Sequence, residues 1–222
     1  MNALPPPFDL LPALLPGLLI TIQITLGGAL IAAFAALTAG LARLSKRSVV
    51  RIAAVIYIDL FRGTSALVQL FWVYFALPML GIKLSAMTTG ILVLGLNVGS
   101  YGAEVVRSTI QAVPKTQWEA AKALNFTPGY TLWRIVLPQA LPAMLPPFGN
   151  LLIELLKGTA LVSMITLTDL TFSAQTLRAE TLRSGEIFGL LLLLYFILAM
   201  LITWLIRRLE KQFGGVRRSE IE

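Results

Sequence analysis

Residues 117–142 read QWEAAKALNFTPGYTLWRIVLPQALP, and they lie between two strongly apolar stretches of the chain. The quoted segment carries charged, aromatic and helix-capping residues, whereas each neighbouring stretch is long enough and apolar enough to enter a bilayer. A chain that enters the membrane on both sides of this segment therefore keeps a structured, water-compatible element between two of its spans.

The capping residues of this segment predict two helices with a sharp corner between them. Pro114 suits the first turn of a helix, and Asn125 suits the left-handed conformation that ends one. Thr127 and Pro128 then fit the N-cap and the first position of a second helix. We expect Pro138 to end that helix or to kink it into the next apolar stretch.

Composition places the whole chain in the membrane. Of its 222 residues 57% are hydrophobic and 13% are charged, whereas soluble domains carry about a quarter charged residues. The apolar runs are long and unbroken, which favours helices over the alternating strands of a barrel. The chain has no Cys and no His, which excludes thiol catalysis, disulfides and the common zinc sites. We expect a single all-α integral membrane domain over residues 1–222, with no metal and no nucleic-acid partner.

Five apolar stretches are candidates for transmembrane helices, which need about 20 residues each. They cover residues 14–41, 64–80, 87–106, 141–166 and 187–206. Lys and Arg gather after the first stretch, between the third and fourth, and in the C-terminal tail, and such basic loops usually lie in the cytoplasm. The net charge of +7 has the same explanation. The pattern predicts five spans, with the N-terminus outside and the C-terminus and residues 117–142 inside.

Polar side chains recur at helical spacing within the third and fourth stretches. They lie at i, i+4 and i+7 on one face of each helix: Asn97, Tyr101 and Glu104, and Asn150, Glu154 and Lys157. Charges at membrane depth usually line a path or form pairs. Two interpretations stay open: a polar route for a zwitterion, or ion pairs that fix helix packing or dimer register. Such pairs could join Glu154 to Lys157 and Glu104 to Arg107.

Arg62 and Thr64 stand where the second stretch begins. They could line the inner mouth of a path, or Arg62 could be an interfacial residue that anchors the second span.

The helix that holds Glu119, Ala120 and Ala121 is a candidate docking element. Small side chains let a helix approach the groove of another protein closely, and a charge fixes its register. An ordinary cytoplasmic loop explains the same spacing equally well. Trp133 could face such a partner, but we expect it to fold back onto the hairpin.

EAAKALN and IVLPQALP resemble the cytoplasmic EAA loop of ABC importer permeases. Matching positions are Glu119, Ala120, Ala121, Ile135, Leu137 and Pro138. Asn125 stands where the family has Gly, and Asn can adopt the same backbone conformation. Three further segments resemble the polar amino-acid branch of these permeases: YIDLFRGTSALVQLFWVYFALP, YGAEVVRSTIQAVPKTQWEAA and PPFGNLLIELLKGTALVS. The resemblance thus covers most of the chain.

This resemblance implies a type I ABC importer (MetI-like) fold in the bacterial inner membrane. Residues 111–138 would be the coupling loop, with Glu119, Ala120, Ala121 and Asn125 docking on a cytoplasmic ATP-binding subunit. It also implies a second permease, identical or a sister subunit, and a periplasmic or extracellular solute-binding protein. The implied substrate is a polar amino acid or a related zwitterion, and ALNFTP with ELLKGTALVS looks most like permeases for ectoine and hydroxyectoine.

The chain lacks the G-x-x-x-x-G-K-[ST] phosphate loop. ATP and Mg²⁺ would therefore bind the partner subunit, and this chain would be a transport subunit and not an enzyme. Two other classes remain. A secondary transporter driven by an ion gradient often shows internal repeats, and none is evident here. A non-transporting membrane scaffold explains the spans but not the two polar faces.

Overall fold

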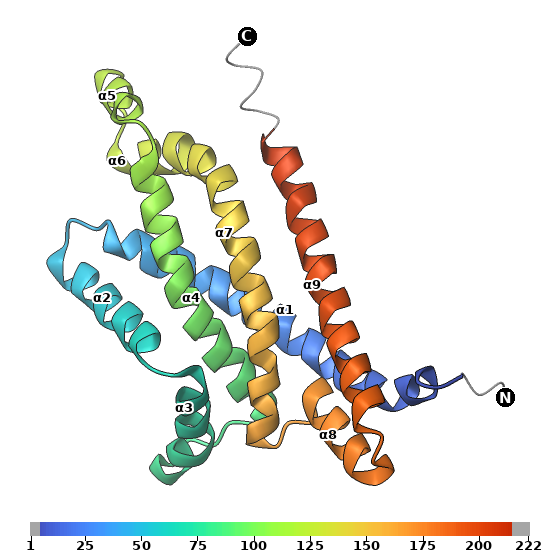
Figure 1. Cartoon of the computed structure of the whole chain (residues 1–222). Coiled ribbons are helices and arrows are strands. Elements are labelled where there is room, and N and C mark those ends of the chain that lie inside the picture. The colour runs from blue at the N-terminus through green and yellow to red at the C-terminus, as the bar shows by residue number, and fades with distance from the viewer. Residues whose placement is uncertain (1–4, 215–222) are drawn as a thin grey trace.

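The computed structural model describes residues 5–214, which form a helical bundle without strands in that range (Figure 1). In chain order the elements are η1 (Phe8–Leu10), α1 (Leu11–Arg43), α2 (Ser48–Gly63), α3 (Ala66–Phe71), η2 (Trp72–Ala76), η3 (Leu77–Leu80), α4 (Ala86–Ala112), α5 (Lys115–Ala123), α6 (Pro128–Thr131), η4 (Leu132–Val136), α7 (Leu137–Gly158), η5 (Thr159–Ile165), α8 (Leu170–Thr181) and α9 (Ser184–Gly214). In Figure 1, α5 and α6 lie at the same end of the bundle as the end of α9, and α3 and α8 lie at the other. The predicted all-α fold is confirmed.

Four helical stretches are long and apolar enough to cross a membrane: Phe8–Arg43, Ala86–Ala112, Pro128–Ile165 and Ser184–Gln212. The fifth candidate is a bent pair, Ser48–Gly63 and Ala66–Leu80, whose two parts meet at 104°. Ala66–Leu80 rises about 22 Å, which is less than the roughly 30 Å of a hydrocarbon core. The predicted second span therefore crosses only if both parts of the bent pair count as one span.

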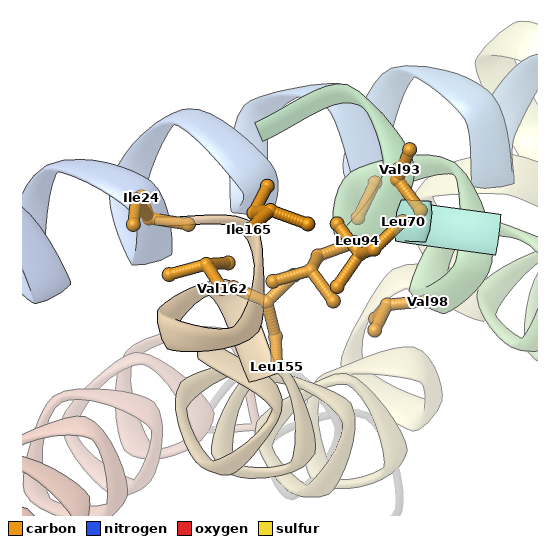
Figure 2. Packing of buried hydrophobic residues seen from close by; sticks show 9 residues of the cluster. Ile24, Leu70, Val93, Leu94, Val98, Leu155, Val162 and Ile165 are labelled. Atoms are coloured by element: carbon orange, nitrogen blue, oxygen red, sulfur yellow. The ribbon is translucent and has the colours of Figure 1, made fainter. Parts of the chain in front are cut away.

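α1 and α4 make the most extensive contact in the bundle, and small residues bring them close together. A Cβ placed on Gly99 would lie 2.7 Å from the Cβ of Ala35, and one on Gly95 would lie 2.7 Å from the Cβ of Ile31. Small residues are the usual means of close helix packing in a bilayer. Figure 2 shows the apolar cluster beside this contact, in which residues of α1, α3, α4, α7 and η5 pack together.

Two wide helical turns each precede a Leu-Pro pair. In η2 and in η4, the N–H of Leu77 and of Leu137 donates to the carbonyl five residues earlier. The following residues, Pro78 and Pro138, have no N–H, and the wide turn lets each helix continue. Pro138 therefore does not end its helix, which continues to Ile165 with a bend where it enters the bundle (Figure 1).

A fully buried carboxyl group caps α8 at the end of the bundle opposite α5. Asp169 accepts hydrogen bonds from the N–H of Phe172 (3.0 Å) and of Thr171 (3.1 Å), and so caps α8. The N–H of Leu170 donates to Oγ1 of Thr21 on α1 (3.1 Å). Burial raises the pKa of the Asp169 carboxyl, and the two N–H donors act against that rise. This end of α8 is thus held to α1 by buried polar contacts.

Asp169→Ala should lower the free energy of unfolding by about 1 kcal/mol, because α8 loses its cap. Asp169→Asn should retain most of that stability, because Asn is an equally good cap. Because burial raises the folded-state pKa, the wild type should gain stability relative to the Asn variant as pH falls through that pKa. Thermal unfolding in detergent measures both effects. An Ala variant as stable as the wild type would contradict the role of the cap.

Candidate functional site: a projecting hairpin and three polar clusters

The corner between α5 and α6 has the predicted backbone geometry. Asn125 has a φ of 57°, and its N–H donates to the carbonyl of Lys122 (3.0 Å). The N–H of Phe126 donates to the carbonyl of Ala121 (3.0 Å), which completes a Schellman motif. Oγ1 of Thr127 then accepts from the N–H of Tyr130 (3.3 Å) and caps the next helix. The predicted left-handed Asn and the predicted N-cap are both confirmed.

The hairpin exposes several charged and several apolar side chains. Glu119, Ala120 and Asn125 are exposed, whereas Ala121 is only 2% exposed and packs inward. Trp133 is 59% exposed, so the prediction that it folds back onto the hairpin is wrong. Three further exposed side chains were not predicted from the sequence: Leu124, Phe126 and Tyr130. Together with Glu119 and Trp133 they form what we call the hairpin patch. An exposed apolar surface of this kind is typical of a protein-binding site.

The bend between α2 and α3 is held by a network of amide side chains. Nδ2 of Asn97 donates to the carbonyl of Phe61 (3.0 Å) and to Oε1 of Gln69 (3.2 Å). Nε2 of Gln69 donates to Oγ1 of Thr64 (2.6 Å) and also reaches the Phe61 carbonyl (3.0 Å). The bend frees backbone carbonyls from the helix, and these amides provide them with donors. Sequence reasoning missed Gln69, which is a lone amide in an apolar run.

Arg62 lies at the same bend. Its guanidinium carbon is 5.1 Å from the centre of the Tyr101 ring, a cation–π distance. Beside the bend is a cavity of about 520 Å³, and Thr64 and Gln69 contribute to walls that are otherwise apolar. The structure thus brings four predicted path residues together at the junction of α2, α3 and α4: Arg62, Thr64, Asn97 and Tyr101.

Glu104 is paired with arginines from two helices. It lies 2.8 Å from Nη2 of Arg107 on the same helix, as the spacing predicted. It also lies 3.4 Å from Nη2 of Arg43, at the end of α1. Nothing in the local spacing pointed to Arg43, because it lies 61 positions before Glu104. The carboxylate thus links α1 to α4.

Asn150, Glu154 and Lys157 form a separate exposed face on α7. Within residues 5–214 no ion pair joins Glu154 to Lys157, so the pairing that their spacing allowed is not formed. Asn150 lines a small cleft between α7 and α9. Leu155, which follows Glu154, belongs to the apolar cluster of Figure 2. A charge exposed to lipid at mid-membrane costs roughly 3 kcal/mol or more. This face therefore requires a polar neighbour, which is either another subunit or a water-filled path.

Comparison with known proteins gives consistent matches. Residues 34–214 match the family described as binding-protein-dependent transport system inner membrane component. The chain is 47% identical over 211 residues to the probable amino-acid ABC transporter permease protein y4tF of Sinorhizobium fredii, which covers 91% of this chain and 89% of that protein. A solved amino acid ABC transporter with histidines superimposes with a TM-score of 0.83 at 33% identity, covering 90% of this chain and 94% of that one.

The inward-facing MetNI methionine ABC transporter has the same fold, with a TM-score of 0.80 at 19% identity over 95% of this chain and 99% of that one. The predicted type I ABC importer fold is therefore confirmed.

Asn125→Gly should leave the hairpin intact, because Gly adopts a positive φ without strain. Asn125→Ala should strain the corner by about 1–2 kcal/mol and increase protease cleavage between α5 and α6. Limited proteolysis of the purified complex measures this difference. Thr116→Ala, at an exposed position of α5, is the control and should behave as wild type. Equal cleavage of the Gly and Ala variants would show that the corner does not depend on its φ.

Proposed function

The chain belongs to the family of binding-protein-dependent transport system inner membrane components, and we propose that it translocates a polar amino acid or a related zwitterion. It is a multi-pass transport subunit of the inner membrane and not an enzyme. In the assembly that we propose, a separate cytoplasmic subunit hydrolyses ATP with Mg²⁺, and an external solute-binding protein delivers the substrate. A second permease, identical or a sister subunit, completes the path.

The observation that carries the substrate class is the exposed face of Asn150, Glu154 and Lys157. Glu154 and Lys157 lie three residues apart on one face of α7, about one helical turn from each other. A zwitterion offers an ammonium group to Glu154 and a carboxylate to Lys157, and the Asn150 amide can serve either group. The two charges attract opposite ends of one molecule, which favours zwitterions over simple anions or cations.

Arg62 and Thr64 remain exposed at the bend, and we assign them to the inner part of the same route. Asn97 and Tyr101 support that route by holding the bend in place through Phe61, Gln69 and Arg62. A path role for Glu104 stays a prediction, since its arginine partners equally fit a link between two helices.

The hairpin patch is the surface that we assign to the ATPase. ATP-driven closure of two ATPase subunits would move two such hairpins together and shift the permease from inward- to outward-facing. Ala120 and Asn125, which are exposed beside Glu119 of the patch, belong to the same docking surface in this proposal, whereas Ala121 is buried and supports it.

The arrangement of the two ends supports the predicted orientation. The hairpin and the basic end of α9 lie at one end of the bundle (Figure 1). Asp9 and Arg183 form an ion pair at the other end. We propose that the hairpin end is cytoplasmic and that the N-terminus is outside. Arg217 and Arg218, which belong to the predicted basic tail, lie outside the described residues.

The narrower choice of ectoine or hydroxyectoine rests on sequence resemblance alone. The relatives at 47% and 33% identity are described as amino-acid ABC transporters, and they support the broader class. Family membership disfavours a secondary transporter or an inert scaffold. The deciding experiment is ATPase activity and ATP-dependent uptake by the complex in lipid, with the binding protein loaded in turn with amino acids and with ectoine. Uptake driven by an ion gradient without ATP would overturn the proposal.

Glu119→Lys should abolish ATP-driven uptake while the protein still inserts and dimerises, because it reverses the charge at the docking surface. Uptake into vesicles and co-purification of the ATPase measure the effect. Glu180→Lys makes the same reversal at an exposed position of α8, at the opposite end of the bundle, and should leave uptake unchanged. Wild-type uptake by the Glu119 variant would rule out this coupling surface.

Lys157→Met should lower uptake at least tenfold while basal ATPase activity persists, because the substrate carboxylate loses a charge partner worth roughly 1.5–3 kcal/mol. The paired assay compares uptake and ATPase in the same vesicles. Lys83→Met, in the exposed loop before α4, is the matched control and should leave both unchanged. Loss of folding in the Lys157 variant would instead favour a packing role.

A further inference from the structure

An apolar groove runs between α1 and α2. It has a volume of about 560 Å³, within the usual range of ligand sites. Alanines on both helices leave the space open, and its walls include Phe34, Ala39, Ala53 and Tyr57. No other part of residues 5–214 fills it, and both Phe34 and Val49 are largely exposed. In a bilayer this groove therefore opens toward the hydrocarbon or toward a neighbouring chain.

One end of the groove is basic. Ala42 and Val49 line it, so the short connection between them lies at that end of the groove. The connection carries Lys46 and Arg47, and Arg51 follows in the first turn of α2. All three are exposed, and within residues 5–214 none of them forms an ion pair. Arg43, by contrast, is already engaged by Glu104.

α2 has the character of an interfacial helix. Its outward apolar residues Ile52, Ile56 and Leu60 are all more than half exposed. The helix turns by 104° before the chain continues into α3, so the two parts cannot both run along the membrane normal. A helix with a basic start and an apolar face suits the boundary between headgroups and acyl chains.

We propose that this groove binds an anionic phospholipid of the inner leaflet. One acyl chain lies between α1 and α2, and the phosphate group lies against Lys46, Arg47 and Arg51. Charge complementarity decides between occupants. An apolar helix from a second copy would fill the groove but would leave three cations without a partner, whereas an anionic lipid satisfies both regions.

The three basic residues set the expected selectivity. Each Lys or Arg near an anionic surface contributes roughly a fivefold preference. Together they give a preference on the order of 100-fold for an anionic over a zwitterionic headgroup, and salt should reduce it.

The absence of Cys from the sequence makes a clean test possible. Ala53→Cys places one thiol in the groove for a bimane label, in the full chain purified with its partner subunits. The complex is placed in phosphatidylcholine vesicles that contain either brominated phosphatidylglycerol or brominated phosphatidylcholine at equal mole fraction. We expect the mole fraction that gives half-maximal quenching to be at least tenfold lower for brominated phosphatidylglycerol than for brominated phosphatidylcholine. High salt should remove this difference.

A matched pair of variants isolates the basic cluster. Lys46→Gln/Arg47→Gln/Arg51→Gln should remove the preference for the anionic lipid. Arg207→Gln/Arg208→Gln/Lys211→Gln, which removes the same charge from α9, should retain it. Equal quenching by the two brominated lipids in the labelled Ala53→Cys protein overturns the proposal. Disulfide linkage of two Ala53→Cys chains without quenching also overturns it, because a second copy would then occupy the groove. If the first triple variant fails to fold, the salt dependence of quenching in the labelled Ala53→Cys protein tests the role of the basic cluster. A preference for the anionic lipid that high salt does not reduce would contradict it.

Discussion

The close packing of α1 against α4 is the contact on which the rest of the bundle depends. Lipid chains are as apolar as the helices, so helix association in a bilayer relies on packing rather than on exclusion of water. Gly95 and Gly99 provide that packing, because each brings the α4 backbone against a side chain of α1. α1 also contacts α2, α7 and α8. A side chain at either glycine would therefore disturb a helix that most of the bundle shares.

A second constraint explains where the polar residues lie. Backbone groups freed from a helix at membrane depth must find partners inside the protein. The bend between α2 and α3 frees the carbonyl of Phe61, and Asn97 and Gln69 both donate to it. The same amide of Asn97 was a candidate for a transport path. One side chain can support the shape of a path without contacting the substrate, and sequence spacing alone cannot separate these two roles.

Local chemistry was readable from the sequence, and long-range geometry was not. Asn125 and Thr127 carry backbone preferences of their own, and Glu104 meets Arg107 within one helical turn. The 104° bend depends on contacts with α4, and the Glu104–Arg43 ion pair joins two different helices. Residues far apart in the sequence make both features, so neither can be predicted from the spacing of neighbouring residues. The wide turn before Pro138 did leave a local signal, the Leu-Pro pair, and of the two predicted outcomes, a helix end or a kink, the structure shows the continuing, bent helix. Spacing permitted a Glu154–Lys157 pair but does not require one, and both side chains are exposed.

The placement of α1 also has a consequence for how the chain assembles during synthesis. The N-terminal half of α1 and the preceding η1 have polar partners that lie late in the sequence: Thr21 accepts from the N–H of Leu170, 149 positions on, and Asp9 of η1 pairs with Arg183, 174 positions on. At typical bacterial translation rates these partners emerge roughly 10–30 s after α1. α1 is therefore synthesised before the polar partners of its N-terminal half. These contacts form only after α8 and the start of α9 have been synthesised. The last third of the chain therefore completes the packing around α1.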